Sequence, residues 1–266
     1  MKLQEIIDQS VYGTIGYISR LEDIDLIEQY ILYNLTILKK FKKIIVATNY
    51  KKELYLLGLR YEEMWKKYFS NIIFLHSNEN RGHNHGYTDL DNMIFDYCKD
   101  NEIKWLCKSS NDMIFIESML DIDIEDANFY YMNGIGYGGM VSYNFNFDKI
   151  LKEDFYPQTN FYFLDVSKVD YLNNKDYLNE TYKQILEIPN YNGRIWEYIN
   201  GWSCENFLKQ CILRNNLIKY HLINQEKYII LLEAIKQNQI HDSSHKNIMI
   251  NGICHLQNSE QQILEI

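Results

Sequence analysis

A polar cluster between two apolar stretches is the part of this sequence best suited to chemistry. The segment reads Lys104-Trp-Leu-Cys-Lys-Ser-Ser-Asn-Asp112-Met-Ile-Phe115. We expect a buried strand over 103–107 that surfaces at Lys108 and Ser110 and ends near the carboxylate of Asp112. Ligands of open α/β sheets bind at the carboxyl ends of the strands. Carboxylate oxygen suits a hard cation such as Mg²⁺ or Mn²⁺, and an ammonium group suits phosphate, so this tip is a candidate site for both.

Other polar residues follow the ends of the preceding apolar strands, which we expect over 14–19, 43–48 and 71–75. In chain order they are Ser19 and Arg20, then Thr48 and Asn49, then Asn80, Arg81 and Gly82. Arginine binds phosphate with a planar fork of donors, and an asparagine amide can both donate to and accept from a base edge. If these tips share one edge of a sheet, their side chains together with Lys108 and Asp112 would cradle a pyrophosphate.

Each of these assignments has a simpler alternative. Asn80-Arg81-Gly82 could be an ordinary turn in which Gly82 supplies a positive φ. Asn49 could form an Asx-turn and Asp112 could cap the turn that follows it. Lys108 could pair with a surface acid, which would contribute little. Only their coincidence at successive strand ends favours a binding site.

The elements that would position these residues alternate between apolar strands and amphipathic helices. In the first half, helices are expected over 25–38, 53–69 and about 88–99, between the strands over 14–19, 43–48, 71–75 and 103–107. Later strands are expected over 129–132 and 160–166, and later helices over 196–217 and 225–236. This order predicts an α/β fold with a mostly parallel twisted sheet, right-handed crossovers and helices on both faces.

Composition excludes several classes of protein. The chain of 266 residues has a formal net charge of -9, which disfavours a bulk electrostatic interaction with nucleic acid or an anionic membrane. Its five cysteines are scattered without a CxxC pair, so we expect reduced thiols in the core. There is no apolar run long enough to span a bilayer and no signal-peptide pattern at the start, which predicts a cytoplasmic protein. With two prolines and no flexible linker, we expect a single domain over 1–266, in which the residues after Gln257 are mostly polar.

The order of elements over 14–115, with Asn80-Arg81-Gly82 and Lys108-Ser-Ser-Asn-Asp112, resembles the GT-A fold of nucleotide-sugar-dependent glycosyltransferases. In that family a similar loop precedes a helix and then a strand that ends in a DxD metal motif. Lys108 to Asp112 is also similar to the Lys-x-Asp-Asp-Asp pattern of one galactosyltransferase branch. Ser110 and Asn111 replace its first two acids, so only Asp112 keeps the carboxylate that usually meets the metal. This departure weakens the expected dependence on a divalent cation.

The resemblance also implies roles for residues outside that motif. Asp89 and Asn92 would touch hydroxyls of the donor sugar, unless they only cap and solvate their helix. Glu205, in Trp202-Ser-Cys-Glu205-Asn206, occupies the position of the base in inverting members, although Asn206 departs from the usual second acid. A glutamate favoured by the helix dipole is the alternative. His241 or His245 would complete the metal shell, and Lys246 would face the diphosphate.

Together these features predict a hexosyltransferase whose half over about 14–115 binds the nucleotide-sugar and whose smaller, mixed part over about 116–256 binds the acceptor. The resemblance implies a UDP-linked hexose donor, a glycan or other hydroxyl acceptor, and Mn²⁺ or Mg²⁺ as cofactor. One alternative is a non-catalytic sugar-nucleotide binder, suggested by the loss of two acids. The other is a sugar nucleotidyltransferase, which needs a basic, glycine-rich loop after its first strand. The acidic segment Leu21-Glu-Asp-Ile-Asp25 at that position argues against it.

Overall fold

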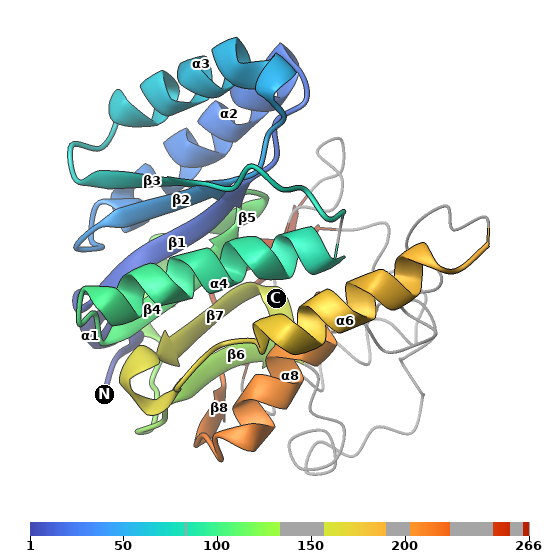
Figure 1. Cartoon of the computed structure of the whole chain (residues 1–266). Helices are drawn as coiled ribbons and strands as arrows, with labels where there is room; N and C mark the ends of the chain where they lie inside the picture. Colours follow the sequence, from blue (N-terminus) through green and yellow to red (C-terminus); the bar gives the residue numbers. More distant parts are fainter. Residues whose placement is uncertain (83, 134–156, 190–202, 224–246, 256–262, 266) are drawn as a thin grey trace.

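The computed structural model describes residues 1–82, 84–133, 157–189, 203–223, 247–255 and 263–265. Its centre is a seven-stranded sheet with the strand order β3-β2-β1-β4-β7-β6-β8. Strands β3, β2, β1 and β4 run parallel to one another, and β7 is antiparallel to both of its neighbours, β4 and β6. Helices cover both faces of this sheet, so the α/β fold class is confirmed (Figure 1).

The first half of the chain builds the parallel part of the sheet. Its elements are α1 (Leu3–Ile7), β1 (Ser10–Gly16), α2 (Leu21–Leu38), β2 (Ile44–Thr48), a 3₁₀ turn (Lys52–Leu54), α3 (Tyr55–Lys66), β3 (Ile72–His76), α4 (Asn84–Asp100) and β4 (Trp105–Ser110). Parallel neighbours need a crossover between them, and the helices α2, α3 and α4 provide these crossovers.

The second half of the chain completes the central sheet with the strands β7, β6 and β8 and adds a smaller sheet. Its described elements are β5 (Met113–Phe115), a 3₁₀ turn (Glu117–Asp121), β6 (Phe129–Asn133), β7 (Pro157–Asp165), a 3₁₀ turn (Val166–Lys168), α6 (Lys175–Leu186), α8 (Cys204–Arg214), β8 (Lys219–His221), β9 (Asn247–Ile250), β10 (Ile253–His255) and β11 (Ile263–Glu265). The last three strands and β5 form a mixed four-stranded sheet in the order β11-β9-β10-β5.

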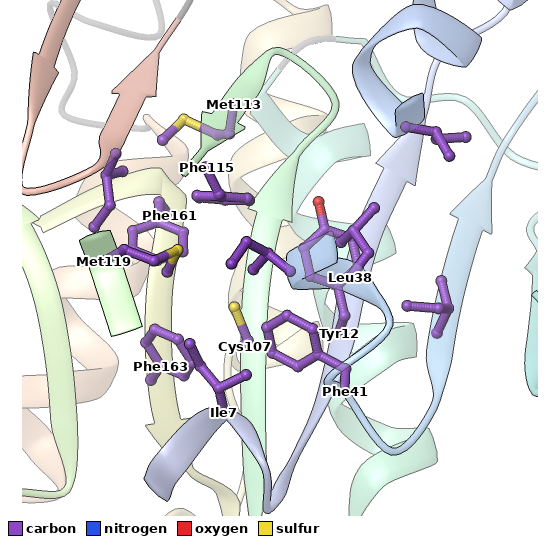
Figure 2. Packing of buried hydrophobic residues seen from close by; sticks show 14 of the residues in the cluster. Ile7, Tyr12, Leu38, Phe41, Cys107, Met113, Phe115, Met119, Phe161 and Phe163 are labelled. Carbon is purple, nitrogen blue, oxygen red and sulfur yellow. The ribbon is translucent and has the colours of Figure 1, made fainter. Parts of the chain in front are cut away.

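Each face of the central sheet has its own hydrophobic core, because successive strand residues point to opposite faces. On one face, Tyr12 and Cys107 pack with Leu38 of α2 and with Phe115 and Phe163 (Figure 2). On the other face, residues that include Val11, Leu106 and Tyr162 pack against α4 and α8. The members of that cluster from α4 and α8 are Leu90, Ile94, Phe95, Cys98, Leu208, Cys211 and Ile212.

Two findings bear on the expectations from composition, for the part of the chain that the structure describes. All five cysteines are buried and free, so they are core thiols. Among the described helices, none combines the length and the apolar character that crossing a bilayer requires.

Several element boundaries differ from those expected, and the differences move candidate residues. Strand β1 begins at Ser10 and ends at Gly16, so Ser19 and Arg20 lie in the turn before α2. Strand β4 continues to Ser110 instead of ending at Cys107, which places Lys108 inside the sheet. Residues 225–236 lie outside the described residues, as does the first part of the helix expected over 196–217.

Candidate functional site

A cavity of about 400 Å³ opens at the carboxyl ends of the parallel strands. The residues around it come from β1 and the turn after it, from the end of β2, from the loop after β3 and from α4. They are Ile15, Tyr17, Asn49, Asn80, Gly82, Tyr87 and Leu90. Three of the residues expected at the strand ends, Asn49, Asn80 and Gly82, are among them. This is the edge of the sheet at which open α/β proteins bind ligands.

The loop before α4 forms a tight turn on the rim of this cavity. The side-chain oxygen of Asn80 accepts a hydrogen bond from the backbone N–H of Gly82 at 3.1 Å, and Gly82 has a φ of 85°. Asn80-Arg81-Gly82 therefore forms the ordinary turn that was the simpler alternative for this segment. At Gly86, an added Cβ would lie 3.3 Å from both the Asn49 amide and the Arg81 backbone nitrogen. The absence of a side chain at Gly86 lets the loop and Asn49 lie close to the first turn of α4.

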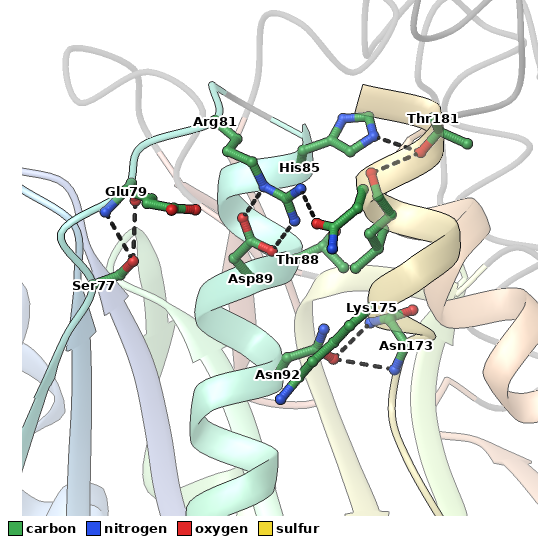
Figure 3. Close-up of polar contacts among 12 residues, drawn as sticks. Ser77, Glu79, Arg81, His85, Thr88, Asp89, Asn92, Asn173, Lys175 and Thr181 are labelled. Carbon is green, nitrogen blue, oxygen red and sulfur yellow. Dashed lines mark hydrogen bonds and ion pairs between the residues drawn. The ribbon is translucent and has the colours of Figure 1, made fainter. Parts of the chain in front are cut away.

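Arg81 lies in this loop, but its side chain is engaged beside the cavity. Its guanidinium donates to both carboxylate oxygens of Asp89, one turn into α4, and to Asn179 of α6 at 2.6 Å (Figure 3). It also lies over the ring of Tyr182, 5.3 Å from the centroid. Asp89 raises the pKa of Arg81. Arg81 and Asp89 therefore bind each other and fasten α6 to α4, which differs from the phosphate and sugar contacts expected of them.

Lys108 is completely buried between β4 and α4. It follows Leu106 by two residues, so it lies on the same face of β4, the face that α4 covers. Its ammonium group contacts the hydroxyl of Tyr87 at 2.6 Å, the carbonyl oxygen of Thr159 at 3.2 Å and Asp91 at 3.2 Å. Lys108 is thus held beneath the cavity instead of facing phosphates at its rim.

The tip of β4 connects Asp112 to the neighbouring strand. Asn111 accepts a hydrogen bond from the Thr14 hydroxyl at 2.8 Å and donates one to the Ile15 carbonyl at 2.7 Å. Ser110 donates to the carboxylate of Asp112. Neither Ser110 nor Asp112 is among the residues described as lining the cavity, although Ile15, which Asn111 contacts, is one of them.

Glu205 lies in the first turn of α8, next to β7. Ser203 caps this helix by accepting from the backbone N–H of Asn206, and an acid in the first turn is favoured by the helix dipole. The Thr159 hydroxyl donates to Glu205 at 3.3 Å, and the backbone N–H of Cys204 donates to the side chain of Asn84 at 3.4 Å. These contacts bring the start of α8 against the start of α4, close to the wall of the cavity formed by Tyr87.

The other predicted binding residues make local contacts. Asp23, in the first turn of α2, accepts hydrogen bonds from both Ser19 and Arg20, so these two residues are held against the start of that helix. Thr48 lies 3.1 Å from the ring of His76 on the adjacent strand. Asn92 accepts from the backbone and side chain of Asn173, and it is not among the residues that line the cavity. The structure therefore uses these positions to join elements, where donor contacts were expected.

The described residues do not by themselves form a metal site. Within them there is no group of three or more His, Cys, Asp or Glu side chains that could hold an ion. His241 and His245, predicted as metal ligands, and Lys246, predicted to face the diphosphate, lie outside the described residues. Asp112 is the one predicted ligand that the structure places.

Burial dominates the electrostatics of the cluster beneath the cavity. It raises the pKa of Asp91 from 3.8 to about 6, against the opposing effect of the Lys108 ammonium, and the charge of Glu205 raises it further. Burial also raises the pKa of the Tyr87 hydroxyl well above its usual value, with Asp91 as the next cause. The Asp91 carboxylate is thus paired with Lys108, but burial makes its charged form unfavourable. The Tyr87 hydroxyl stays protonated and can donate a hydrogen bond.

Comparisons with known proteins leave the family open. No family model matches the sequence, and no curated protein matches it. One solved structure that is similar is the nucleoside-diphosphate-sugar pyrophosphorylase from Vibrio cholerae RC9, with a TM-score of 0.41 and 10% identity over 84% of this chain and 99% of that chain. A likeness at this level carries no argument about what this chain does.

Sequence reasoning missed the residues that surround Lys108. Asp91 and Tyr87 are one turn apart on α4, on the side that packs on the sheet. The available signal was that Asp91 interrupts an apolar stripe formed by Leu90, Ile94 and Cys98. An acid within such a stripe implies a buried cationic partner, because charged side chains are almost never fully buried unless they are paired.

Proposed function

We propose that this protein binds a nucleotide-sugar in the cavity at the carboxyl ends of β1, β2 and β3 and transfers its hexose to a hydroxyl acceptor. The observation that carries the proposal is the position of the cavity: three strand ends and the first turns of α4 meet around it, with the carboxylate of Glu205 nearby. A cleft with an amide, backbone groups and aromatic rings suits a base and its ribose.

The residues divide between binding and chemistry. Asn49 would recognise the base edge, for which uracil is our first choice, and Tyr17 and Tyr87 would flank it. Glu205 would take the proton of the acceptor hydroxyl as the new bond forms, as a positioned carboxylate can. If the reaction retains the configuration at the anomeric carbon of the sugar, Glu205 would not act as this base, and the binding roles of the other residues would be unchanged.

We further propose that Asp112, with His241 or His245, binds Mn²⁺ or Mg²⁺. Such a cation would offset the charge that develops on a diphosphate leaving group. Because the described residues contribute one carboxylate, the cation is expected to assist binding of the diphosphate without being needed for binding of the base.

The test is release of UDP from UDP-glucose or UDP-galactose, with and without Mn²⁺, together with calorimetric titration of UDP. We expect turnover in the wild type and a roughly ten-fold weaker UDP affinity in Asn49→Ala, the loss of about one hydrogen bond. Asp112→Ala should remove the effect of Mn²⁺ on affinity, whereas Asp100→Ala, an exposed acid at the far end of α4, should not.

Other outcomes would redirect the assignment. UDP binding without turnover would indicate a sugar-nucleotide binder, and no UDP binding would remove the proposal. A sugar nucleotidyltransferase would instead release pyrophosphate from a nucleoside triphosphate and a sugar 1-phosphate. The same cavity would serve that reaction, so this assay belongs beside the first one.

A further inference from the structure

The buried cluster around Lys108 has a composition that needs explaining. An ammonium group has three hydrogen-bond donors. Those of Lys108 have three acceptors in reach, namely the Tyr87 hydroxyl, the Thr159 carbonyl and the Asp91 carboxylate. A buried ion pair is a poor source of stability, because desolvation of the two charges offsets their attraction. The cluster is therefore better explained by the residues that it holds in place.

The cluster lies between the cavity and Glu205. At one end, Tyr87 lines the cavity and donates its hydroxyl proton to the Thr159 carbonyl at 2.8 Å. At the other end, the Thr159 hydroxyl donates to Glu205 at 3.3 Å. Lys108 contacts both Tyr87 and Thr159, so a single ammonium group fixes the wall of the cavity relative to the residue that orients Glu205.

We propose that Lys108 and Thr159 are positioning residues: Lys108 fixes Tyr87 and the backbone of Thr159, and the Thr159 hydroxyl directs Glu205 toward the acceptor. This inference rests on the proposed function, because it assigns the orientation of the base in that reaction. It explains why a lysine occupies the interior of β4, where an apolar residue would pack at lower cost.

The charges around Asp91 provide a readout that does not depend on catalysis. The titratable groups that face it come from α4, β4, β7 and α8, and they are Tyr87, Lys108, Tyr162, Cys204 and Glu205. Burial is the main cause of the raised pKa of Asp91, and Glu205 is the one among these groups whose negative charge raises that pKa further. The titration of Asp91 thus reports whether Glu205 is held close to the cluster.

The kinetic test compares Thr159→Val with Thr159→Ser, using UDP release from the UDP-hexose that the wild type turns over. Valine keeps the backbone carbonyl and the shape but removes the hydroxyl, so kcat should fall about ten-fold, the equivalent of one hydrogen bond to a charged group. KM for the donor should stay within about two-fold, since the cavity wall is unchanged, and serine should restore kcat. A wild-type kcat in Thr159→Val, or a change in KM alone, would overturn the inference.

The second test follows the carboxyl carbon of Asp91 by NMR as pH is varied. Glu205→Gln and Thr159→Val should both lower the midpoint from about 6, whereas Thr159→Ser and Glu187→Gln, an exposed acid after α6, should leave it unchanged. An unchanged midpoint in the first two variants would refute the positioning role. If the wild type releases no UDP, the proposed function fails, and this titration still decides whether Thr159 holds Glu205 beside the cluster.

Discussion

Replacing Lys108 by methionine should destabilise the protein more than its loss of packing explains. Methionine matches the length of the buried stem, so the main change is that Asp91 loses its cation inside the protein. Breaking a buried ion pair by removing one partner costs about 3–5 kcal/mol. At this chain length such a loss lowers Tm by roughly 6–20 °C.

The pKa of Asp91 sets the pH dependence of this loss. Raising that pKa from 3.8 to about 6 already corresponds to an unfavourable free energy of about 3 kcal/mol for the charged form. Because the folded-state pKa lies above the unfolded one, the stability that Asp91 contributes is present below pH 4 and is lost as pH rises through about 6. Removing Lys108 raises the pKa further. The loss in free energy of unfolding caused by Lys108→Met should therefore be larger at pH 7.5 than at pH 5. These two pH values lie on either side of the pKa of Asp91.

The matched control is the double variant Lys108→Met/Asp91→Leu, which removes both charges. It should recover most of the stability, since an apolar pair of similar volume is often as stable as a buried ion pair. The measurement is urea unfolding of the three proteins at both pH values. If the single and double variants lose equal stability, or if the stability lost in the single variant does not depend on pH, the unpaired charge of Asp91 is not the cause of that loss.

Two further predictions concern polar groups outside this pair. Asn111→Ala should cost about 1–3 kcal/mol in urea unfolding, because it leaves the Thr14 hydroxyl and the Ile15 carbonyl without their partner, and a loss below 0.5 kcal/mol would contradict the contact. Burial lowers the pKa of His221 from 6.5 to about 4, so its stabilising contribution of about 3 kcal/mol is present above pH 6.5 and is lost as pH falls toward 4. His221→Asn should remove that part of the acid sensitivity, and an unchanged pH profile would exclude it.

The sequence predicted the fold because its information is local and repeated. Strands such as Ile44–Thr48 are buried throughout and apolar up to their last residue, as expected when both faces are covered, and the intervening helices have one apolar side. The smaller sheet was missed for the opposite reason. Its strand β5, Met113–Phe115, pairs with β10, Ile253–His255, across more than half of the chain, and three-residue strands carry no periodicity of their own.

The site was predicted less well because side-chain partners come from distant elements. Lys108 looked like a strand tip when β4 was expected to end at Cys107, and only the packing of α4 against β4 shows that it is interior. Its partner Asp91 lies on that helix, and Thr159 lies on a strand that follows much later. In contrast, Asn49 and Gly82 could be predicted from the ends of β2 and β3 alone, and both line the cavity.

The departure from the DxD pattern has a structural explanation in this chain. An amide at Asn111 can accept from Thr14 and donate to Ile15 at the same time, which ties the tip of β4 to β1. A carboxylate there would place an acceptor oxygen against the Ile15 carbonyl oxygen, which is also an acceptor, and the bond that Asn111 donates would be lost. The substitution Asn111→Asp would therefore loosen the strand tip that precedes Asp112. It follows that Asn111 fits this chain as a structural residue, and that any cation chemistry at this tip depends on Asp112 and on Ser110, which donates to it.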